Sequence, residues 1–374
     1  MTRRLRIALV HPYHWHDVRR GGERYFADLA WHLTTQGHEV DVVTGTWGPP
    51  SVTDEDGVTV RRVRHVMRRR LEARGVSVVD TFGVAALRVL RKERYDVVHA
   101  MTPTTAVASR LTGHRTLLTA LGHPTPEQFG LRPFDRRLAA AGFRAAHVRA
   151  AFSAASARQV RELFGRDCIV LPLGVRAADF PPELSARVGP PRLLFAGFPG
   201  DPRKGVETAL FAMPRVLDAY PYAKLLLPGE RAHHEHLHDR LGAERDRVLA
   251  AVEDLGVLPM SQMPALYRSV TVSLLPSVWE ALGISLVESL ASGTPAVCSD
   301  DGGMPSIVSK PQVGAVVAPG DPAALAAGLL HAIELARDPA TPAACAEHAR
   351  RWDWTQQVGP EHERVYASMT TGPQ

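Results

Sequence analysis

Short apolar runs recur along the chain, separated by segments whose apolar residues are spaced as on one face of a helix. Continuous apolar runs that alternate with helical patterns are typical of βαβ units, in which helices cover both faces of a parallel sheet. The first half of the chain therefore predicts a doubly wound α/β domain. Its expected strands lie at residues 6–10, 39–45, 58–63, 96–100, 116–120, 151–156 and 168–173.

A proline-rich segment at 181–191 (PPELSARVGPP) follows this series and is typical of a linker. A chain of 374 residues is also longer than one hydrophobic core usually covers. We therefore expect two Rossmann-like doubly wound domains, 1–183 and 184–352, facing a central cleft where ligands bind at the carboxyl ends of the strands. The expected strands of the second domain lie at 192–197, 224–229, 270–275, 296–300 and 315–320.

Composition indicates a soluble protein of the cytoplasm. Hydrophobic residues make up 45% of the chain, and no apolar run approaches membrane-spanning length. The apolar part of the N-terminal RRLRIALV is too short for a signal peptide. Cys168, Cys298 and Cys345 are scattered and odd in number, so they predict no disulfide framework. Richness in Ala, Arg, Val and Leu is typical of bacteria with GC-rich DNA.

Two carboxylates eight positions apart, Glu280 and Glu288, occur in VWEALGISLVESLASGTPAVCSDDGG. That spacing is a little over two helical turns, so both are expected on one face where a helix starts, the first in the entering loop. An acidic residue near a helix N-terminus is common for dipole reasons alone. Glu288 is less ordinary because it interrupts an apolar face, where a carboxylate needs partners such as ligand hydroxyls.

The same segment, Glu-x7-Glu followed by A-x-G-x-P-V and a Gly-Gly loop, resembles the retaining glycosyltransferases of family 4, which have the GT-B fold. HPYHWHDVRRGGERYFADLAWHLTTQGHEVDVVTG is similar to the family's opening strand, glycine loop and first helix. YDVVHAMTP, LPLGVRAADF, DPRKGVETAL and WDWTQQVGPEHERVYASM fall at its other landmarks. The family includes bacterial enzymes such as the phosphatidylinositol mannosyltransferases. The resemblance implies that 353–374 forms a helix that returns to the N-terminal domain.

The resemblance implies a clamp for the donor diphosphate in DPRKG, after the expected strand 192–197. Arg203 and Lys204 would supply positive charge there, aided by the dipole of the following helix. An Arg-Lys pair in a turn is more often simply solvated, and the position before a glycine favours function for Lys204. Phe198 follows Gly197 where the family usually has an arginine. That departure removes a charge-assisted hydrogen bond of about 1.5–3 kcal/mol unless Arg203 replaces it.

The two glutamates complete the implied donor site. Glu280 and the backbone amides of Leu282 and Gly283 would hold the transferred sugar. Glu288 would accept hydrogen bonds from the ribose hydroxyls of the nucleotide. Lys204 would neutralise the charge that develops on the leaving diphosphate.

In the N-terminal domain, Gly21 and Gly22 precede an expected helix, and backbone amides at such a position can hold a phosphate. A simple turn before a helix explains the two glycines about equally well. The resemblance implies that this loop lies beside the donor diphosphate and the acceptor, with His11 and His14 bordering the cleft. His123, at the end of an expected strand, corresponds to a histidine that contacts the donor sugar and takes part in catalysis. Its alternative role is a hydrogen bond to a neighbouring carbonyl.

These implications define an expected reaction. A sugar passes from a UDP- or GDP-type donor to a small-molecule or lipid acceptor with retention of configuration, through an oxocarbenium-like centre. His123, Glu280 and Lys204 are the expected catalytic residues, and neither a metal nor a cofactor is needed. The runner-up is a sugar-nucleotide 2-epimerase of the same fold, which would need carboxylates placed to activate an elimination. No G-x-G-x-x-G fingerprint follows the first strand, which argues against a nicotinamide enzyme.

Two short motifs suggest other chemistry. His234, Glu235 and His238 match H-E-x-x-H, which places two zinc ligands on one face of a helix. No third ligand is evident nearby, and the polar surroundings favour a solvated helix over a zinc hydrolase. The triplet Asp-Glu-Asp at 54–56 has the form of a metal-binding D-x-D, but Gly57 follows it, so a turn is the better interpretation.

The basic run at 61–74 (RRVRHVMRRRLEAR) is the strongest local charge feature. Its apolar residues are spaced as one helical face, as peripheral contact with an anionic membrane would need. A solvated loop is slightly favoured because a net charge of +5 over 374 residues is mild. A non-catalytic binder of anionic surfaces stays a distant alternative. No interleaving of aromatic and basic residues occurs, so we expect no nucleic-acid partner.

Overall fold

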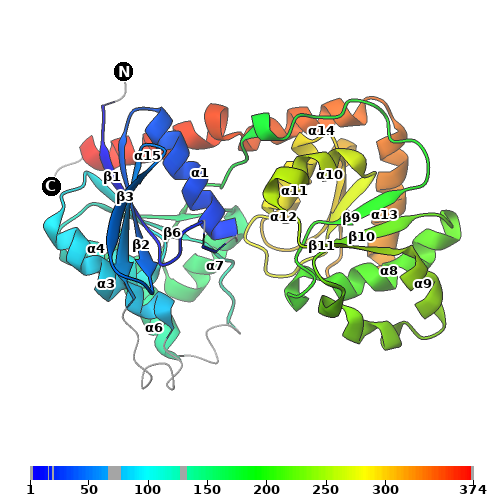
Figure 1. Cartoon of the computed structure of the whole chain (residues 1–374), viewed down its shortest axis with the longest axis horizontal. Helices are drawn as coiled ribbons and strands as arrows, with labels where there is room; N and C mark the ends of the chain where they lie inside the picture. Colours follow the sequence, from blue (N-terminus) through cyan, green and yellow to red (C-terminus); the bar gives the residue numbers. More distant parts are fainter. Residues whose placement is uncertain (1–2, 16, 19–20, 66–76, 127–132, 372–374) are drawn as a thin grey trace. The chain divides into compact units, whose positions relative to one another are not determined.

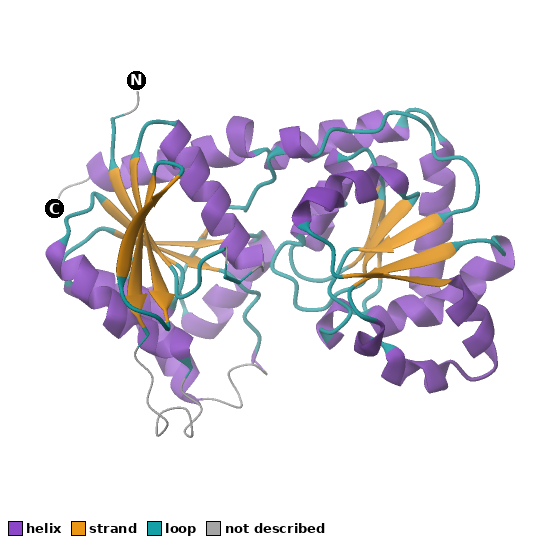
Figure 2. Ribbon diagram, viewed as in Figure 1, coloured by secondary structure: helices purple, strands orange, loops and turns teal. Residues whose placement is uncertain are grey.

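A computed structural model describes residues 3–15, 17–18, 21–65, 77–126 and 133–371. The chain divides into two compact units, each seen in Figure 1. Unit 1 comprises Met1–Gly174 and Trp354–Gln374, and unit 2 comprises Val175–Asp353. Both contain a largely parallel sheet with helices on its faces (Figure 2), which confirms the predicted α/β class with two doubly wound units.

The sheet of unit 1 has eight strands in the order β3-β4-β2-β1-β5-β6-β7-β8. Neighbouring strands are parallel except β3 and β4, which form an antiparallel hairpin at one edge. The order reverses between β1 and β5, because the chain adds β2 on one side of β1 and β5 on the other. The strands are β1 (Arg6–Val10), β2 (Glu39–Thr46), β3 (Ser51–Glu55), β4 (Val58–Arg64), β5 (Val97–Ala100), β6 (Thr116–Ala120), β7 (Val148–Ala151) and β8 (Ile169–Val170).

Side-chain caps start several helices of unit 1. Ser77 and Thr102 each accept a hydrogen bond from the backbone three residues on, which satisfies a backbone N–H that has no partner within the helix. The described helices are α1 (Gly21–Thr35), α3 (Val78–Lys92), α4 (Pro103–Leu111), α6 (Pro133–Ala145), α7 (Ala154–Phe164), a π-helical turn (Trp354–Val358) and α15 (Gly359–Thr371).

The C-terminal helix α15 packs within unit 1 through buried polar contacts. Nε2 of His362 lies 2.8 Å from the hydroxyl oxygen of Tyr25 on α1. The hydroxyl oxygen of Tyr366 lies 2.7 Å from Nδ1 of His99 on β5. Burial lowers the pKa of His362 to about 4, so this ring is neutral at ordinary pH. The helix is therefore fixed to the sheet by specific hydrogen bonds as well as by apolar packing.

The sheet of unit 2 has six parallel strands in the order β11-β10-β9-β12-β13-β14. Its order also reverses once, between β9 and β12. The interior of this unit is formed mainly by apolar residues of the central strands and of the helices α8 (Val206–Ala219) and α13 (Pro322–Arg337). The strands are β9 (Arg192–Phe195), β10 (Lys224–Pro228), β11 (Val252–Gly256), β12 (Val272–Leu275), β13 (Ala296–Ser299) and β14 (Gly314–Val317).

Segments of 3₁₀ helix lie in many of the connections of unit 2, at Ala177–Asp179, Pro202–Lys204, Arg231–His233, Glu235–Glu244, Met260–Gln262, Pro311–Val313 and Arg350–Trp352. The described α-helices are α8 (Val206–Ala219), α9 (Arg245–Ala251), α10 (Met263–Ser269), α11 (Ile284–Ala291), α12 (Met304–Ile307), α13 (Pro322–Arg337) and α14 (Thr341–Ala349).

Two expectations about local structure are wrong. The strand expected at 151–156 ends at Ala151, because Ser153 accepts a hydrogen bond from the Ser156 N–H and caps α7. Asp54 and Glu55, expected in a turn, belong to the edge strand β3. The turn itself is shorter and consists of Asp56 and Gly57, both with positive φ.

Two further features differ from the sequence pattern. Strand β11 at the edge of the second sheet was not expected, because its sequence, VEDLG, carries only two aliphatic residues. Gly21 and Gly22 form the first turn of α1, so they belong to the helix and not to a preceding loop.

Candidate functional site

The carboxyl edge of a doubly wound sheet binds ligands where the strand order reverses, because the loops from the two adjacent strands turn to opposite faces. In unit 2 this place lies between β9 and β12. The loop after β9 carries Lys204, and the loop after β12 carries Glu280. Nζ of Lys204 donates a hydrogen bond to Oε2 of Glu280, forming an ion pair whose side chains are 26% and 17% exposed.

A glycine brings these two loops into contact. Gly205 has a φ of 76°, and a Cβ at this position would collide with the carbonyl oxygen of Pro276. Just before it, the carbonyl oxygen of Arg203 accepts a hydrogen bond of 2.8 Å from the N–H of Val278. The backbone itself therefore places Lys204 beside Glu280, without relying on the ion pair.

Glu280 is also tied to the loop after β13. Its N–H donates to Oδ1 of Asp301 at 3.2 Å, and its carbonyl oxygen accepts from the N–H of Gly303 at 3.0 Å. A Cβ at Gly302 would collide with that carbonyl oxygen. The preceding residue, Trp279, has a φ of 57°, a conformation that costs a bulky residue about 1–3 kcal/mol. Contacts on both sides hold this strained segment in place.

Arg203, the other predicted phosphate contact, pairs with a neighbour in its own turn. Its Nε and Nη2 donate to the carboxylate of Asp201 at 3.1 and 2.7 Å. Burial alone would raise the pKa of Asp201, but the hydrogen bonds with Arg203 lower it below its ordinary value. Arg203 thus lies in the same turn as Lys204, and each of the two cations is engaged with a carboxylate of the protein.

Glu288 and Glu280 take different partners, although both belong to one motif. Glu288 lies on α11, is only 3% exposed, and accepts a hydrogen bond of 2.9 Å from the Tyr267 hydroxyl. Leu282 is buried, and Gly283, with a φ of 90°, is the N-cap of α11. Tyr267 on α10 has no motif of its own, so sequence reasoning missed it.

Phe198 replaces the arginine that the resemblance expects, and no charge replaces it at that position. Its ring is 52% exposed and packs edge-on against the ring of His233, with 4.7 Å between the centroids. A Cβ at Gly200 would approach the Phe198 ring to 2.6 Å. The position thus presents an aromatic surface beside the loop that follows β10.

The strand-order reversal of unit 1 carries the predicted histidines His11 and His14, which follow β1. Nδ1 of His11 lies 2.9 Å from the carbonyl oxygen of Tyr13. Burial lowers the pKa of His11 to about 4, although the hydrogen bond with Tyr13 opposes this shift. Nε2 of His14 lies 3.6 Å from the carboxylate of Glu55 on β3. At neutral pH His11 is therefore an uncharged group.

The remaining predicted residues of unit 1 lie at the start of α1 and after β6. A Cβ on Gly22 would approach the Leu121 side chain to 3.3 Å, whereas one on Gly21 would meet nothing within 4 Å. His123 follows Leu121 in the loop after β6, and its Nδ1 lies 3.1 Å from the hydroxyl of Ser156 on α7. The structure thus brings Gly22 next to the loop that carries His123.

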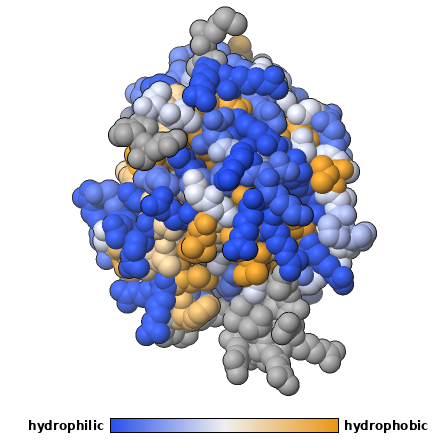
Figure 3. All heavy atoms as spheres, turned by 90° about the vertical axis from the view of Figure 1, so that its left-hand side faces the viewer, coloured by the Kyte–Doolittle hydropathy of each residue, from blue (hydrophilic) through white to orange (hydrophobic). Residues whose placement is uncertain are grey.

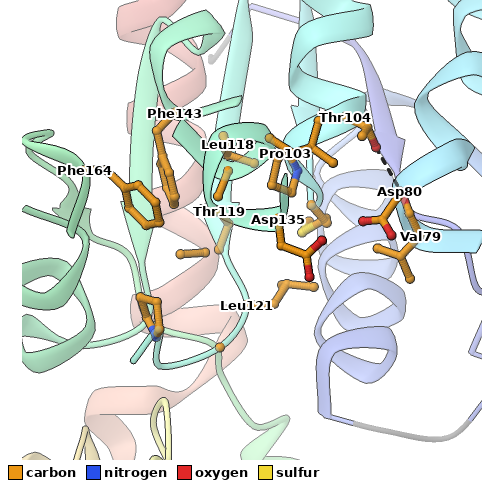
Figure 4. A pocket seen from close by; sticks show the side chains of 16 residues that line it. Val79, Asp80, Pro103, Thr104, Leu118, Thr119, Leu121, Asp135, Phe143 and Phe164 are labelled. Atoms are coloured by element: carbon orange, nitrogen blue, oxygen red, sulfur yellow. Dashed lines mark hydrogen bonds between the residues drawn. The ribbon is translucent and has the colours of Figure 1, made fainter. Parts of the chain in front are cut away.

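A cavity of about 260 Å³ lies in unit 1 at the carboxyl ends of β5 and β6 (Figure 4). Sequence reasoning missed it, because its walls come from segments far apart in the chain, namely Met101 after β5, strand β6 with its following loop, and helices α3, α4, α6 and α7. Leu118, Phe143 and Phe164 form an apolar side, and Asp80, Thr104 and Asp135 provide polar groups. Thr119 also lines the cavity, and its hydroxyl lies 2.7 Å from Nε2 of His99. This chamber has room for part of a small polar molecule.

The H-E-x-x-H motif forms a chain of hydrogen bonds. Nδ1 of His234 lies 3.0 Å from Nε2 of His238, and Nε2 of His234 lies 2.6 Å from Oδ1 of Asp254. The segment Glu235–Glu244 is a 3₁₀ helix, so the expected α-helical presentation of the two histidines is wrong. Within the described ranges, no group of three or more His, Cys, Asp or Glu residues has the arrangement of a metal site.

The basic run at 61–74 is only partly described. Arg61 and Arg62 belong to β4, where they pair with Asp41 and Glu55 respectively. Residues 66–74 of the run lie outside the described residues. Among the helices that the structure describes, none is long and apolar enough to cross a bilayer. On the face of unit 1 seen in Figure 3, hydrophilic residues predominate and apolar residues form small groups.

Comparisons with known proteins cover both units. Residues 19–179 match the family described as Glycosyltransferase Family 4, and residues 181–352 match the family described as Glycosyl transferases group 1. A phosphatidyl-myo-inositol mannosyltransferase of Mycobacterium tuberculosis is 30% identical over 393 residues, covering 98% of this chain and 97% of that protein. A glycogen synthase of the same species is 33% identical over 229 residues, 59% of this chain and 54% of that protein.

A solved structure with the same architecture is Anabaena HepE in complex with UDP-glucose. It has a TM-score of 0.74 and 18% identity, with 97% of this chain and 100% of that chain covered. At that identity the likeness concerns the fold, whereas the mannosyltransferase match runs through the sequence of both units. The chain belongs to glycosyltransferase family 4, and its two doubly wound units are those of the GT-B fold.

Proposed function

We propose that this protein transfers a sugar from a UDP- or GDP-type donor to a small-molecule or lipid acceptor, with retention of configuration and without a metal ion. The observation that carries the proposal is the Lys204–Glu280 pair at the strand-order reversal of unit 2. A partly exposed cation beside a glycine suits a diphosphate, and the adjacent carboxylate suits sugar hydroxyls. Membership of the family and the UDP-glucose bound by Anabaena HepE support the same assignment.

In the proposed reaction, the bond between the anomeric carbon and the phosphate oxygen breaks, and its electron pair leaves with the diphosphate. Lys204 neutralises the negative charge that develops there. Glu280 and the amides of Leu282 and Gly283 hold the transferred sugar. An acceptor hydroxyl attacks the anomeric carbon on the face that the diphosphate has left, and its proton leaves with the diphosphate.

Two of the proposed donor contacts come from side chains that already have partners within the protein. Glu288 accepts from Tyr267 through Oε2, and we assign its carboxylate to the ribose hydroxyls. Arg203 donates to Asp201 through Nε and Nη2, and Lys204 donates to Glu280, so each cation already has a carboxylate partner. We assign the larger electrostatic contribution to Lys204, because its partner Glu280 lies across the strand-order reversal, and the smaller one to Arg203, whose partner lies in its own turn.

We assign the acceptor to unit 1, near Gly21, Gly22, His11 and His14, with His123 contacting the donor sugar. His11 is neutral at physiological pH because burial lowers its pKa to about 4. It therefore contributes hydrogen bonding and no charge. The phosphatidyl-myo-inositol named for the mycobacterial relative favours a polyol, free or as a lipid head group, among the candidate acceptors.

We also propose that the protein works in the cytoplasm and touches membranes peripherally, through residues 61–74, when its acceptor is a lipid. Sedimentation with vesicles of anionic and of zwitterionic lipids tests this contact. Binding to anionic vesicles that weakens with added salt is expected. Equal recovery in the supernatant with both vesicle types would remove the membrane contact and leave a soluble acceptor.

A thermal-shift panel of UDP, GDP, ADP and dTDP tests the donor site. A ligand at about 100 times its dissociation constant adds about 2.7 kcal/mol of stability. One nucleotide should stabilise the wild type and the control Lys310→Ala, but stabilise Lys204→Ala and Glu288→Ala much less. Stabilisation of all four proteins alike would remove the donor site from this position, and no shift in any of them would remove the proposal.

Turnover separates transfer from epimerisation. We expect nucleoside diphosphate to be released only when both donor and acceptor are present. Conversion of the donor to its 2-epimer without an acceptor would instead support the epimerase.

A further inference from the structure

Trp279 combines a left-handed backbone with an exposed aromatic side chain, immediately before Glu280. Among the described residues, Asp56 and Trp279 are the two residues other than glycine with positive φ. Asp56 occupies a hairpin turn, where aspartate commonly adopts this conformation. A large aromatic residue has no such preference, so its conformation must be imposed by its surroundings.

The surroundings that impose it belong to the site of the Lys204–Glu280 pair. The N–H of Val278 is bound by the loop after β9, and both backbone groups of Glu280 are bound by the loop after β13. These bonds fix the residues before and after Trp279, leaving its own φ and ψ little freedom. Glycine would satisfy this backbone at lower cost.

Core packing does not explain why a tryptophan stands here. The residue is 43% exposed. Among the described residues, no aromatic ring stacks on its indole and no hydrogen bond involves its side chain. This side chain neither lowers the strain of the backbone nor packs in the interior. Such a side chain is typical of a residue that binds a ligand.

We propose that the indole of Trp279 is a stacking surface for the ring of the transferred sugar, a pyranose that presents its apolar C–H face. The inference rests on the proposed function, and it adds a binding residue to the same site. Glu280, the next residue along the chain, is the group assigned to the sugar hydroxyls. Hydrogen bonds to the hydroxyls fix the sugar ring within its own plane. Stacking on the indole fixes it perpendicular to that plane.

Trp279→Gly and Trp279→Phe separate this role from a structural one. Glycine removes the ring and relieves the left-handed strain, so Tm should stay equal or rise by about 1–3 °C. The same variant should raise KM for the nucleotide sugar about tenfold, whereas phenylalanine should raise it no more than about threefold. Binding of the bare nucleoside diphosphate should stay unchanged in both variants, because the sugar is absent from it.

Intrinsic fluorescence provides a second readout. The chain has six tryptophans, and saturation with nucleotide sugar should quench the wild type and the control Trp47→Phe equally. Trp279→Phe should lose that quench while still turning over. Trp47 is 66% exposed in unit 1, so it controls for loss of an exposed indole.

Three results would overturn the inference. They are an unchanged KM for the nucleotide sugar in Trp279→Gly, an equal loss of affinity for the bare diphosphate, and a change confined to KM for the acceptor. Each requires a wild type that binds a nucleoside diphosphate and turns over. A wild type that does neither would remove the proposed function itself, so the two failures are distinguishable.

Discussion

The two units place different chemistry at the same topological position. In unit 2, the loops at the strand-order reversal carry an ion pair, Lys204 with Glu280, and a glycine that lets the loops touch. In unit 1, the corresponding loop after β1 carries His11, whose pKa burial lowers to about 4. The cavity beside β5 and β6 combines apolar and polar walls.

We infer from this difference that the two units bind different substrates. A doubly wound sheet provides a binding edge in both units, but the side chains in the loops decide which ligand suits it. Partly exposed charge in unit 2 suits an anionic diphosphate. The neutral His11 and the mixed apolar and polar walls of the cavity support our proposal that unit 1 takes the acceptor.

The largest expected effect comes from Lys204→Ala. Removal of the charge assigned to the leaving diphosphate should lower kcat/KM about 100- to 1000-fold. The folded state should lose less than about 1 kcal/mol, because the pair with Glu280 is partly exposed. Steady-state kinetics and thermal unfolding measure the two effects, with Lys310→Ala as the control. A kcat/KM within threefold of the wild type would break the comparison between the units.

The contact between the loops of unit 2 is tested by Gly205→Ala. The new Cβ would collide with the Pro276 carbonyl and sit on a left-handed backbone, so we expect a loss of about 3 kcal/mol. Gly320→Ala is a matched control, because Gly320 has a φ of 69° and nothing within 4 Å of its would-be Cβ. It should lose only about 1 kcal/mol. Equal losses in chemical denaturation would show that the loop contact does not matter.

The pH dependence sharpens the unit 1 side of the comparison. His11 and His362 have pKa values of about 4 in the folded state, against 6.5 for an exposed imidazole. Between these pH values, the two histidines bind protons in the unfolded chain but not in the folded chain. The free energy of unfolding therefore falls as the pH drops from about 6.5 towards 4. Each histidine should contribute a loss of about 2 kcal/mol between pH 7 and pH 5.

Denaturation of the wild type and of His362→Gln at both pH values measures this contribution. The variant should lose about 2 kcal/mol less than the wild type on acidification. If both lose the same amount, the ring of His362 is not the neutral buried group that the structure shows.

The smallest expected effect concerns the attachment of α15. Tyr366→Phe removes the hydroxyl that pairs with His99 and should cost about 1–2 kcal/mol. Tyr222→Phe is the control, because Tyr222 is 79% exposed and should lose almost nothing. Thermal unfolding compares the two variants. A Tyr366→Phe protein as stable as the control would show that the contact between Tyr366 and His99 does not help to hold the helix.

Much of the fold follows from local pattern. The alternation of apolar runs with helical segments predicts the central strands of both sheets, because buried parallel strands must be apolar on both faces. The edge strands β3 and β11 carry polar residues, so the same rule missed them. The start of α7 was missed for another reason, since the Ser153 cap outweighed the apolar run around it.

The sequence by itself determined the fold class and most of the residues proposed for the donor site. Motifs and periodic patterns consist of residues that are close together in the sequence, so they can be recognised without the structure. Only the tertiary structure decided which partner each residue has. Lys204 and Glu280 meet although they are 76 positions apart, and Glu288 on α11 accepts a hydrogen bond from Tyr267 on α10. The left-handed backbone of Trp279 and the cavity of unit 1 were likewise decided by the tertiary structure. They arise from contacts between segments distant along the chain, and such contacts leave no local pattern to detect.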